Sequence, residues 1–408
     1  MSPVQARPQA PQTVEPYTPQ GEELAIGFVS DVMYPFHVGG AEKRIYEIGR
    51  RLSENHEVHL FTMGWGQDGA DEMLDGMHMH KVGPVRSVYA DGDGRRSTRS
   101  SLLFAKDCLR AIPTNEFDVL DFTQAPYLHF LAHRLFKPWD FTPTIFTVHD
   151  TWWPHWDDYL SNPIQRQLAR WVEKTSYQLA DEILAVSQTT AYGIRQTGVD
   201  PDKIHVAPNG VDFEQLANST PDEDGYDIVY TGRLNGYKNV DLLVQAVKCL
   251  EAWGHDVCAG IVGQGPEREH LEELVHDQHL EDRVELLGYL PDIEDVYGLM
   301  KASNVLVQPS NVEGFGIVAL EALSTGTPVL TLDSATNATT ELVLDDELGD
   351  TFGPPATNLA AKLERWIYRD EDPRKKTVRQ QFGRVLDWNR VAERVDRLYH
   401  DVAERGAP

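Results

Sequence analysis

The chain has 408 residues, 41% of them hydrophobic, so it is long enough for two domains of moderate size, each with a buried core. Aspartate and glutamate total 64 against 37 lysine and arginine, and the formal charge of −27 argues against nucleic acid as a partner. The same charge favours a halophilic protein, whose self-repulsion concentrated salt would screen; an acidic cytosolic protein is the alternative.

The N-terminal residues 1–23 contain five prolines and lack the apolar core of a signal peptide, so they are predicted to form a disordered tail. No segment approaches the length of a membrane-spanning helix. The three cysteines have no paired spacing, which indicates a reducing compartment and argues against structural zinc. We therefore expect a cytoplasmic protein, with a peripheral contact at the inner face of a membrane left open.

A first alternation of strands and helices begins with the apolar run 24–29, which is typical of a strand buried on both faces. Gly39 and Gly40 follow it and precede a segment with helical spacing of apolar residues. Glycines there let the backbone approach a ligand, although a plain tight turn explains them equally well. Further strand-like runs lie at 58–62, 118–122, 144–148, 182–186 and 204–207. They predict a parallel sheet with ligands at the carboxyl ends of its strands.

His149 directly follows one of these strands, and this position favours a functional role over a plain core or surface histidine. Trp152, Trp153 and Trp156 come next, and flat indole faces suit sugar rings or a lipid interface. We predict that an acceptor meets the chain here; the alternative is that the tryptophans pack under the following helix. The basic excess within 95–110 suits an anionic lipid headgroup or, equally, a solvated helix face.

Residues 216–225 are predicted to link a first domain at 24–215 to a second at 226–385, in which strands and helices alternate again. Arg233 and Lys238 follow the first strand of this second domain in a glycine-bearing turn. Arginine can fork across two oxygens and lysine acts as a point charge, so the pair suits a diphosphate. Two cations in a loop are otherwise usually solvated surface.

A strand at 304–308 leads through a glycine-bearing loop into a helix, and the free N–H groups at the start of such a helix bind phosphate. Two carboxylates flank this start and are suited to accept hydrogen bonds from hydroxyls. Phosphate and polyol together indicate a sugar nucleotide; the alternative is two solvated acids around an ordinary helix start. The residues concerned are Glu313, Gly314, Phe315, Gly316, Ile317 and Glu321.

This stretch resembles the paired-glutamate motif of retaining glycosyltransferases of family 4, a family that includes glycogen synthases and mannosyltransferases. Other matching elements, in the family's order, are Gly39-Gly40 with Glu42, His149-Asp150, and Arg233-Leu234 with Lys238. The resemblance implies the α/β GT-B fold, with two Rossmann-like parallel-sheet domains facing across a cleft. The first would be the acceptor side and the second the nucleotide-sugar donor side, with residues 386–408 forming a helix that returns to the first domain.

The resemblance also implies transfer of a hexose from a nucleoside diphosphate sugar to a sugar, lipid-linked or small-molecule acceptor, without a metal or other cofactor. Arg233, Lys238 and the helix start at 314–317 would stabilise the leaving diphosphate. Glu313 would hold sugar hydroxyls, Glu321 the ribose, and His149 the sugar from the opposite domain. A GT-B sugar-nucleotide epimerase and a non-catalytic sugar-nucleotide-binding module are the alternatives. Asp91 and Asp93 spell a metal-type motif, but we interpret it as a solvated turn.

Overall fold

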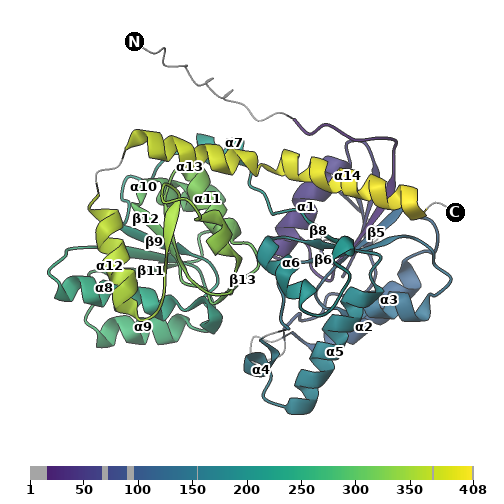
Figure 1. Cartoon of the computed structure of the whole chain (residues 1–408), viewed down its shortest axis with the longest axis horizontal. Helices are drawn as coiled ribbons and strands as arrows, with labels where there is room; N and C mark the ends of the chain where they lie inside the picture. The colour runs from purple at the N-terminus through teal and green to yellow at the C-terminus, as the bar shows by residue number, and fades with distance from the viewer. Residues whose placement is uncertain (1–15, 67–71, 90–95, 154, 370–371, 407–408) are drawn as a thin grey trace, which may run out of the picture.

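The computed structural model describes residues 16–66, 72–89, 96–153, 155–369 and 372–406. The chain forms two α/β domains side by side, with α13 (Pro373–Val385) lying along the C-terminal domain and the long final helix α14 (Trp388–Gly406) lying across the N-terminal domain (Figure 1). Each domain has a sheet covered by helices on both faces, as the strand and helix alternation predicts. The expected two Rossmann-like domains are therefore confirmed.

The N-terminal domain contains an eight-stranded sheet with the order β3-β4-β2-β1-β5-β6-β7-β8. All neighbouring strands are parallel except β3 and β4. The strands are β1 (Ala25–Val29), β2 (Glu57–Thr62), β3 (Glu72–Leu74), β4 (Met77–Lys81), β5 (Val119–Thr123), β6 (Thr144–Val148), β7 (Glu182–Ala185) and β8 (Ile204–Val206). The chain leaves β1 towards β2 and later returns to β5 on its other side. This reversal opens a crevice at the carboxyl ends of β1 and β5.

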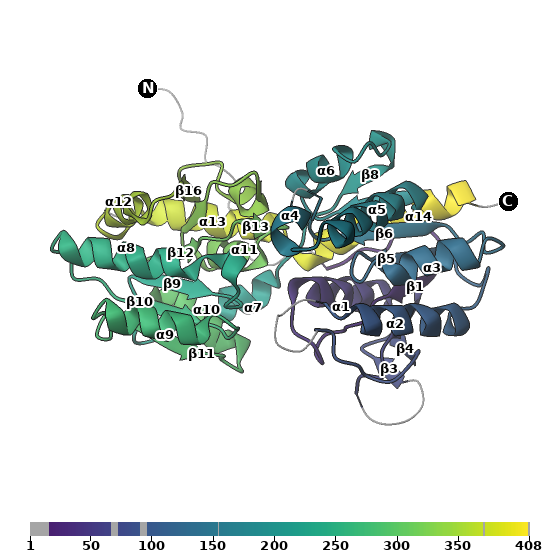
Figure 2. The ribbon, with the colours of Figure 1, turned by 90° about the horizontal axis from the view of Figure 1, so that it is seen from below.

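Two helical layers cover this sheet. One apolar cluster joins it to α1 and α14, and a second joins it to α2, α3, α5 and α6. Figure 2 shows α2, α3 and α5 on the side turned to the viewer. The helices are α1 (Gly40–Leu52), α2 (Thr98–Ala111), α3 (Leu128–Phe136), α4 (Trp156–Tyr159), α5 (Pro163–Leu179), α6 (Gln188–Arg195) and α14 (Trp388–Gly406).

The C-terminal domain has a six-stranded parallel sheet with the order β11-β10-β9-β12-β14-β16. Its strands are β9 (Ile228–Thr231), β10 (Ala259–Val262), β11 (Val284–Gly288), β12 (Val305–Gln308), β14 (Val329–Leu332) and β16 (Gly349–Phe352), with β13 (Val312–Glu313) paired to β15 (Thr336–Asn337) outside the sheet. The strand order reverses between β9 and β12, which places a second crevice there. The helices are α7 (Phe213–Asn218), α8 (Val240–Ala252), α9 (Arg268–Asp277), α10 (Ile293–Ala302), α11 (Ile317–Thr325), α12 (Ala356–Ile367) and α13 (Pro373–Val385).

Two segments cross between the domains and pair with each other. The Val211 N–H donates to the Leu386 carbonyl at 3.0 Å, and the Trp388 N–H donates to the Val211 carbonyl at 3.1 Å. The crossing thus precedes the linker predicted at 216–225: α7 starts at Phe213 and buries Leu216 in the cluster around α11. Hydrophobic burial of Leu216 outweighs the linker-like composition of this stretch.

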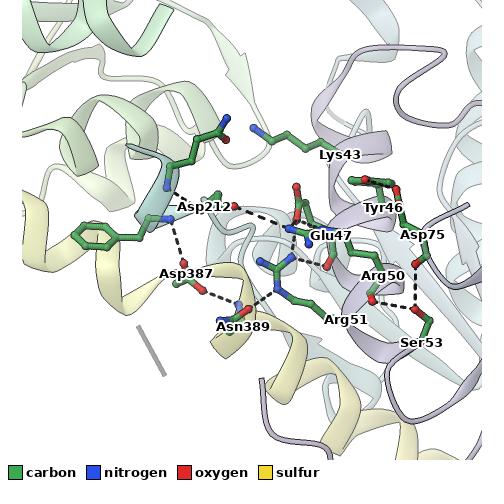
Figure 3. A network of polar contacts seen from close by, with 12 residues as sticks. Lys43, Tyr46, Glu47, Arg50, Arg51, Ser53, Asp75, Asp212, Asp387 and Asn389 are labelled. Atoms are coloured by element: carbon green, nitrogen blue, oxygen red, sulfur yellow. Dashed lines mark hydrogen bonds and ion pairs between the residues drawn. The ribbon is translucent and has the colours of Figure 1, made fainter. Parts of the chain in front are cut away.

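Side chains of α1 hold these crossings together, as Figure 3 shows. Arg51 donates to Asn389 at 2.6 Å and pairs with Glu47 at 2.5 Å. Asp387 accepts from the Phe213 N–H at 3.1 Å. Because these bonds link α1, α7 and the start of α14, the final helix returns to the N-terminal domain as expected.

The predicted disorder of the N-terminal tail is wrong for residues 16–23, while residues 1–15 lie outside the described part. Tyr17 is buried against α14, and its hydroxyl donates to Asp396 at 2.7 Å. The Gln20 N–H donates to the same carboxylate at 2.9 Å. One aromatic anchor and these bonds order a proline-rich segment whose composition alone indicates disorder.

Candidate functional site

The cations predicted to bind a diphosphate lie at the crevice of the C-terminal sheet, in the turn after β9. The Arg233 guanidinium reaches the other domain, donating to the Val38 carbonyl at 2.8 Å and to the Tyr89 hydroxyl at 2.7 Å. Lys238 pairs with Glu313 at 2.5 Å. Burial would lower the pKa of the Lys238 ammonium, but the Glu313 carboxylate outweighs it and holds that pKa above its usual value. Lys238 therefore stays charged.

The glycines of the paired-glutamate loop permit a close approach of the two domains. A Cβ on Gly314 would lie 1.6 Å from the His149 carbonyl oxygen of the opposite domain, so a larger residue cannot stand there. Gly316 has a φ of 86°, in the left-handed region that favours glycine, and caps α11. Gly40 faces Ile317, whose Cδ1 would lie 3.1 Å from an added Cβ. The predicted glycine turn thus meets the start of α11 across the cleft.

Phe315, in the loop before α11, and Glu321, on α11, are both buried. The Glu321 carboxylate accepts from Lys43 of α1 at 3.1 Å and from the Tyr297 hydroxyl at 3.2 Å. Burial would lower the pKa of the Lys43 ammonium, but Glu321 outweighs it and raises that pKa. Lys43 was missed by sequence reasoning, although it lies only three residues after Gly40. This buried pair joins the two domains beside the predicted donor site.

Gln124, which directly follows β5, holds the turn that contains His149. The oxygen of its side-chain amide accepts from the His149 N–H at 2.9 Å and from the Asp150 N–H at 3.1 Å. Burial, reinforced by Arg44, lowers the pKa of His149 to about 3, so its imidazole is neutral at physiological pH. Burial likewise raises the pKa of Asp150 to about 6. Among the described residues the buried Nε2 of His149 has no hydrogen-bond partner, so it can bond a ligand hydroxyl.

Two buried carboxylates complete the N-terminal side: Glu42, which belongs to the glycine element matched from the sequence, and Asp31 just after β1, which sequence reasoning did not single out. Asp31 pairs with Arg96 at 2.5 Å, and Glu42 pairs with His37 at 3.0 Å. Burial raises the pKa of Asp31, outweighing Arg96. Burial would also raise the pKa of Glu42, but the hydrogen bond from His37, a backbone hydrogen bond and the charges of His37 and Arg233 together outweigh it and lower that pKa. Asp31 and Arg96 come from separate segments, so no short motif reveals that pair.

The tryptophan cluster lies between the His149 turn and α5. The Trp152 indole donates to Asp150 at 3.0 Å, and the Trp156 indole donates to Glu173 of α5 at 2.6 Å. All three tryptophans are half-buried, and the rings of Trp152 and Trp156 are 6.0 Å apart. Trp156 therefore packs under the following helix, the alternative considered from sequence, while acceptor binding by Trp152 and Trp153 remains a prediction.

One group in the described part of the chain has residue types suited to a metal: His56, Asp396 and His400. The Leu24 N–H donates to His56 Nδ1 at 3.1 Å, so in the neutral ring the proton is on Nε2, which faces Asp396 at 3.1 Å. A metal-bound histidine instead donates its second nitrogen's proton to an acceptor. The group therefore fits a hydrogen-bonded chain better than a metal centre. Asp91 and Asp93 lie outside the described residues.

None of the helices in the described part is long and apolar enough to span a membrane. Of the residues predicted to act on the donor, the structure brings Arg233, Lys238, Glu313 and the start of α11 together where the two domains meet, opposite Gly40 and His149. Such a set combines positive charge, a helix N-terminus and carboxylates, which is suited to a sugar nucleotide.

Comparison with known proteins also indicates a glycosyltransferase. The model for glycosyl transferases group 1 matches residues 212–381, and that for glycosyltransferase family 4 matches residues 38–215. One subunit of human phosphatidylinositol N-acetylglucosaminyltransferase is 27% identical over 398 residues, covering 95% of this chain and 78% of the human protein. The D-inositol 3-phosphate glycosyltransferase of Salinispora tropica is 27% identical over 404 residues, covering 90% of this chain and 82% of that protein.

Solved structures show the same fold. Sucrose-phosphate synthase from Thermosynechococcus elongatus superposes with a TM-score of 0.75 at 20% identity, covering 94% of this chain and all of that chain. The Anabaena protein HepE, in complex with UDP and glucose, has a TM-score of 0.69 at 18% identity, covering 92% of this chain and 99% of that one. The two family models and the relatives together show that this chain is an enzyme of the group 1 glycosyltransferases, of the family 4 type with the GT-B fold.

Proposed function

We propose that the chain transfers a hexosyl group from a nucleoside diphosphate sugar to an acceptor hydroxyl, with retention of the anomeric configuration and without a metal ion. The observation that carries this proposal is the meeting of Arg233, Lys238 and Glu313 with the start of α11 at one crevice. The leaving diphosphate gains negative charge as its bond to the sugar breaks. Preorganised cations and a helix N-terminus stabilise that charge, and they supply the compensation that a metal ion would otherwise give.

The carboxylates and the histidine orient the sugar in this proposal. Glu313 accepts from sugar hydroxyls and Glu321 from the ribose, while His149 bonds the sugar from the N-terminal domain through its buried Nε2. A neutral imidazole adds no positive charge next to the sugar carbon, which becomes cationic in the transition state. Lys43 and Tyr297 both donate to one oxygen of Glu321, so the ribose would share this carboxylate with them.

The chemical step breaks the bond between the anomeric carbon and the phosphate oxygen and forms one to the acceptor oxygen on the same face. The acceptor's proton passes to the departing phosphate oxygen, so we assign no general base to the protein. The acceptor would lie on the N-terminal side, near Trp152 and Trp153. Two relatives are named for transfer involving an inositol phosphate and a phosphatidylinositol, so cyclitols, free and lipid-linked, are the first acceptors to test.

The test has two stages. Thermal shift with UDP-, GDP- and ADP-sugars identifies the donor, because a ligand that binds the folded state raises Tm. Incubation with that labelled donor and a panel of acceptors then separates the alternatives: glycosylated acceptor supports transfer, epimerised donor indicates the epimerase, and binding without turnover indicates a non-catalytic module. NMR of the product's anomeric proton tests retention. Undiminished transfer with excess chelator tests independence from metal.

A further inference from the structure

The helices α2, α3 and α5 leave a large apolar surface uncovered on the N-terminal domain. α2 packs beside α3, and α3 beside α5, in the layer that faces the viewer in Figure 2. Six large apolar side chains on the outer side of these helices are between 53% and 78% exposed. They are Leu102, Leu135, Phe136, Ile164, Leu168 and Trp171. We refer to this surface, formed by the outer sides of α2, α3 and α5, as the three-helix face.

The helix α5 has two apolar sides. Tyr177 packs into the domain core, while Ile164, Leu168 and Trp171 recur at intervals of four and three residues along the solvent side. With Pro163, these three side chains line a shallow, mainly apolar groove. An apolar stripe this exposed needs an explanation beyond folding, since exposed patches of this kind mark interaction sites.

The charge of the three-helix face is opposite to that of the chain. The helices carry seven arginine and lysine residues against two acids, in a chain with a net charge of −27. Both acids are engaged on the inner side: Glu173 is buried and accepts from Trp156, and Asp107 pairs with Arg86. Nearby, Asp157 of α4 pairs with Arg166 and Arg170 and compensates part of the excess. The basic residues are Arg99, Lys106, Arg110, Arg134, Arg166, Arg170 and Lys174.

We propose that the three-helix face docks on an anionic membrane surface. The basic side chains meet lipid headgroups while Ile164, Leu168 and Trp171 enter the boundary of the acyl chains. A second copy of the chain is the less suitable occupant, because a two-fold dimer would place one basic face against another. The acidic remainder of the molecule is repelled by the same lipids, so the protein has one favoured orientation.

This orientation has a consequence for the cleft. α2 starts near the carboxyl-end edge of the N-terminal sheet, where Arg96 contacts Asp31, and α5 passes this edge at Glu173, which accepts from the Trp152 N–H after β6 and from the Trp156 indole. Docking therefore holds the acceptor side of the cleft next to the bilayer, within reach of a lipid-linked acceptor. The docking itself does not depend on the proposed reaction, whereas this consequence for the acceptor does.

Co-sedimentation with vesicles tests the proposal. We expect the full chain to sediment with phosphatidylcholine vesicles that contain about 30% phosphatidylglycerol, and not with pure phosphatidylcholine, because only the anionic headgroups attract the basic residues. The triple variant Arg99→Glu, Lys106→Glu and Arg110→Glu should lower the partition coefficient at least about a hundredfold. Ile164→Gln with Leu168→Gln should lower it about tenfold or more by removing inserted apolar surface.

A matched control is Trp253→Gln with Leu344→Gln, two exposed apolar residues of the C-terminal domain, which should bind vesicles like the unaltered protein. The proposal is overturned if the unaltered protein ignores anionic vesicles, or if the α5 variant binds as well as the control. It is also overturned if light scattering shows a dimer that the α5 variant dissociates, since the face would then join copies. Thermal shift by the donor should be equal in all variants, so loss of docking is distinguishable from failure of the proposed function.

Discussion

The two domains share a layered α/β plan but bury different side chains. The apolar clusters of the C-terminal domain are accompanied mostly by neutral hydroxyls and amides, with Glu321 and Arg379 as its buried charged groups among the described residues. The N-terminal domain instead buries many ionisable groups, including Arg44, Asp121 and His129. The difference lies both inside the strands, as with Asp121 in β5, and in the helices, as with Arg44 in α1 and His129 in α3.

The buried polar groups of the N-terminal domain join segments distant in the sequence. Arg44 donates to the Pro208 carbonyl at 2.8 Å and to Asn209 at 3.0 Å. Asp121 accepts from the Tyr399 hydroxyl of α14 at 2.6 Å. Such networks specify a unique arrangement but make stability depend on protonation. The comparison teaches that the N-terminal domain couples its fold to pH through buried ionisable groups, of which the C-terminal domain has few among its described residues.

The largest expected effect tests whether the C-terminal domain carries the chemistry. Arg233→Ala and Lys238→Ala should each lower kcat/KM at least about a hundredfold, because each removes preorganised positive charge from the leaving diphosphate. Steady-state kinetics measure this. Lys248→Ala, which removes an α8 lysine paired with Glu251, is the matched control and should be neutral. Unchanged kinetics in either cleft variant would exclude that residue from the site.

A pH titration tests the other half of the comparison. Burial lowers the pKa of His129 to about 3 from an unfolded value of 6.5, so this residue's contribution is complete above pH 6.5 and is lost as the pH falls towards 3. At pH 5 the loss is about 2 kcal/mol relative to neutral pH. We expect denaturant unfolding to show that the free energy of unfolding falls more steeply from pH 7 to pH 5 in the unaltered protein than in His129→Leu.

His276→Leu serves as the control for that titration, because His276 is exposed and lies in the C-terminal domain. Buried carboxyls with a raised pKa, such as Asp121, make the protein more stable as the pH falls. Comparing the unaltered protein with His129→Leu at each pH removes their contribution, because both proteins contain these carboxyls. Parallel stability curves for the unaltered protein and His129→Leu would contradict the account of a pH-dependent N-terminal domain.

Nucleotide binding tests whether residues of one domain or of both domains form the proposed donor site. Glu321→Ala should raise the Kd of the free nucleoside diphosphate about tenfold, since a hydrogen bond to a charged group is lost. Glu313→Ala should leave that Kd nearly unchanged and lower transfer, because its proposed partner is the sugar. Calorimetry with UDP, or with whichever nucleotide thermal shift selects, decides this.

Lys43→Met is the companion variant for that measurement. It keeps the length of the side chain but removes the charge that reaches Glu321 from the N-terminal domain. A Kd that changes with Lys43 as it does with Glu321 would show that both domains build the ribose end of the site. Equal losses in the Glu313 and Glu321 variants would refute the proposed division of roles.

The smallest expected effect concerns net charge. With a formal charge of −27, Tm should rise by a few degrees between low salt and molar sodium chloride as self-repulsion is screened. Calorimetry in sodium chloride is preferable to sulfate, because sulfate strengthens apolar burial by itself. A flat or falling Tm would show that the acidic composition has no role in adaptation to salt.

Much of the fold could be predicted from the sequence because buried parallel strands are continuous apolar runs. The strand at 144–148 coincides with β6, and that at 304–308 includes all of β12. β4 was missed because Met-His-Met-His-Lys alternates with polar residues, β3 because Glu-Met-Leu is short and begins with a charge, and β16 because Gly-Asp-Thr-Phe has a single large apolar residue. Edge strands bury one face or less, so their sequences resemble loops.

The C-terminal part of the candidate site could be predicted because each motif is local: one turn holds Arg233 and Lys238, and one loop leads from Glu313 into α11. The N-terminal part could be predicted only at Gly39, Gly40 and His149, because Asp31, Lys43 and Arg96 make contacts with segments distant in the sequence. Gln124 is a similar case, since nothing near it in the sequence indicates that it holds the His149 turn.

The paired crossings at Val211 and Leu386–Trp388 also limit how this chain can vary. Each crossing is bonded to the other through backbone groups, and a side chain on Gly210 would clash with the Leu386 carbonyl and the Trp388 ring. Adding or deleting a residue in one crossing would shift its register against the other and break both bonds. The two segments must therefore keep matched lengths, so insertions between the domains are tolerated less than insertions in surface loops.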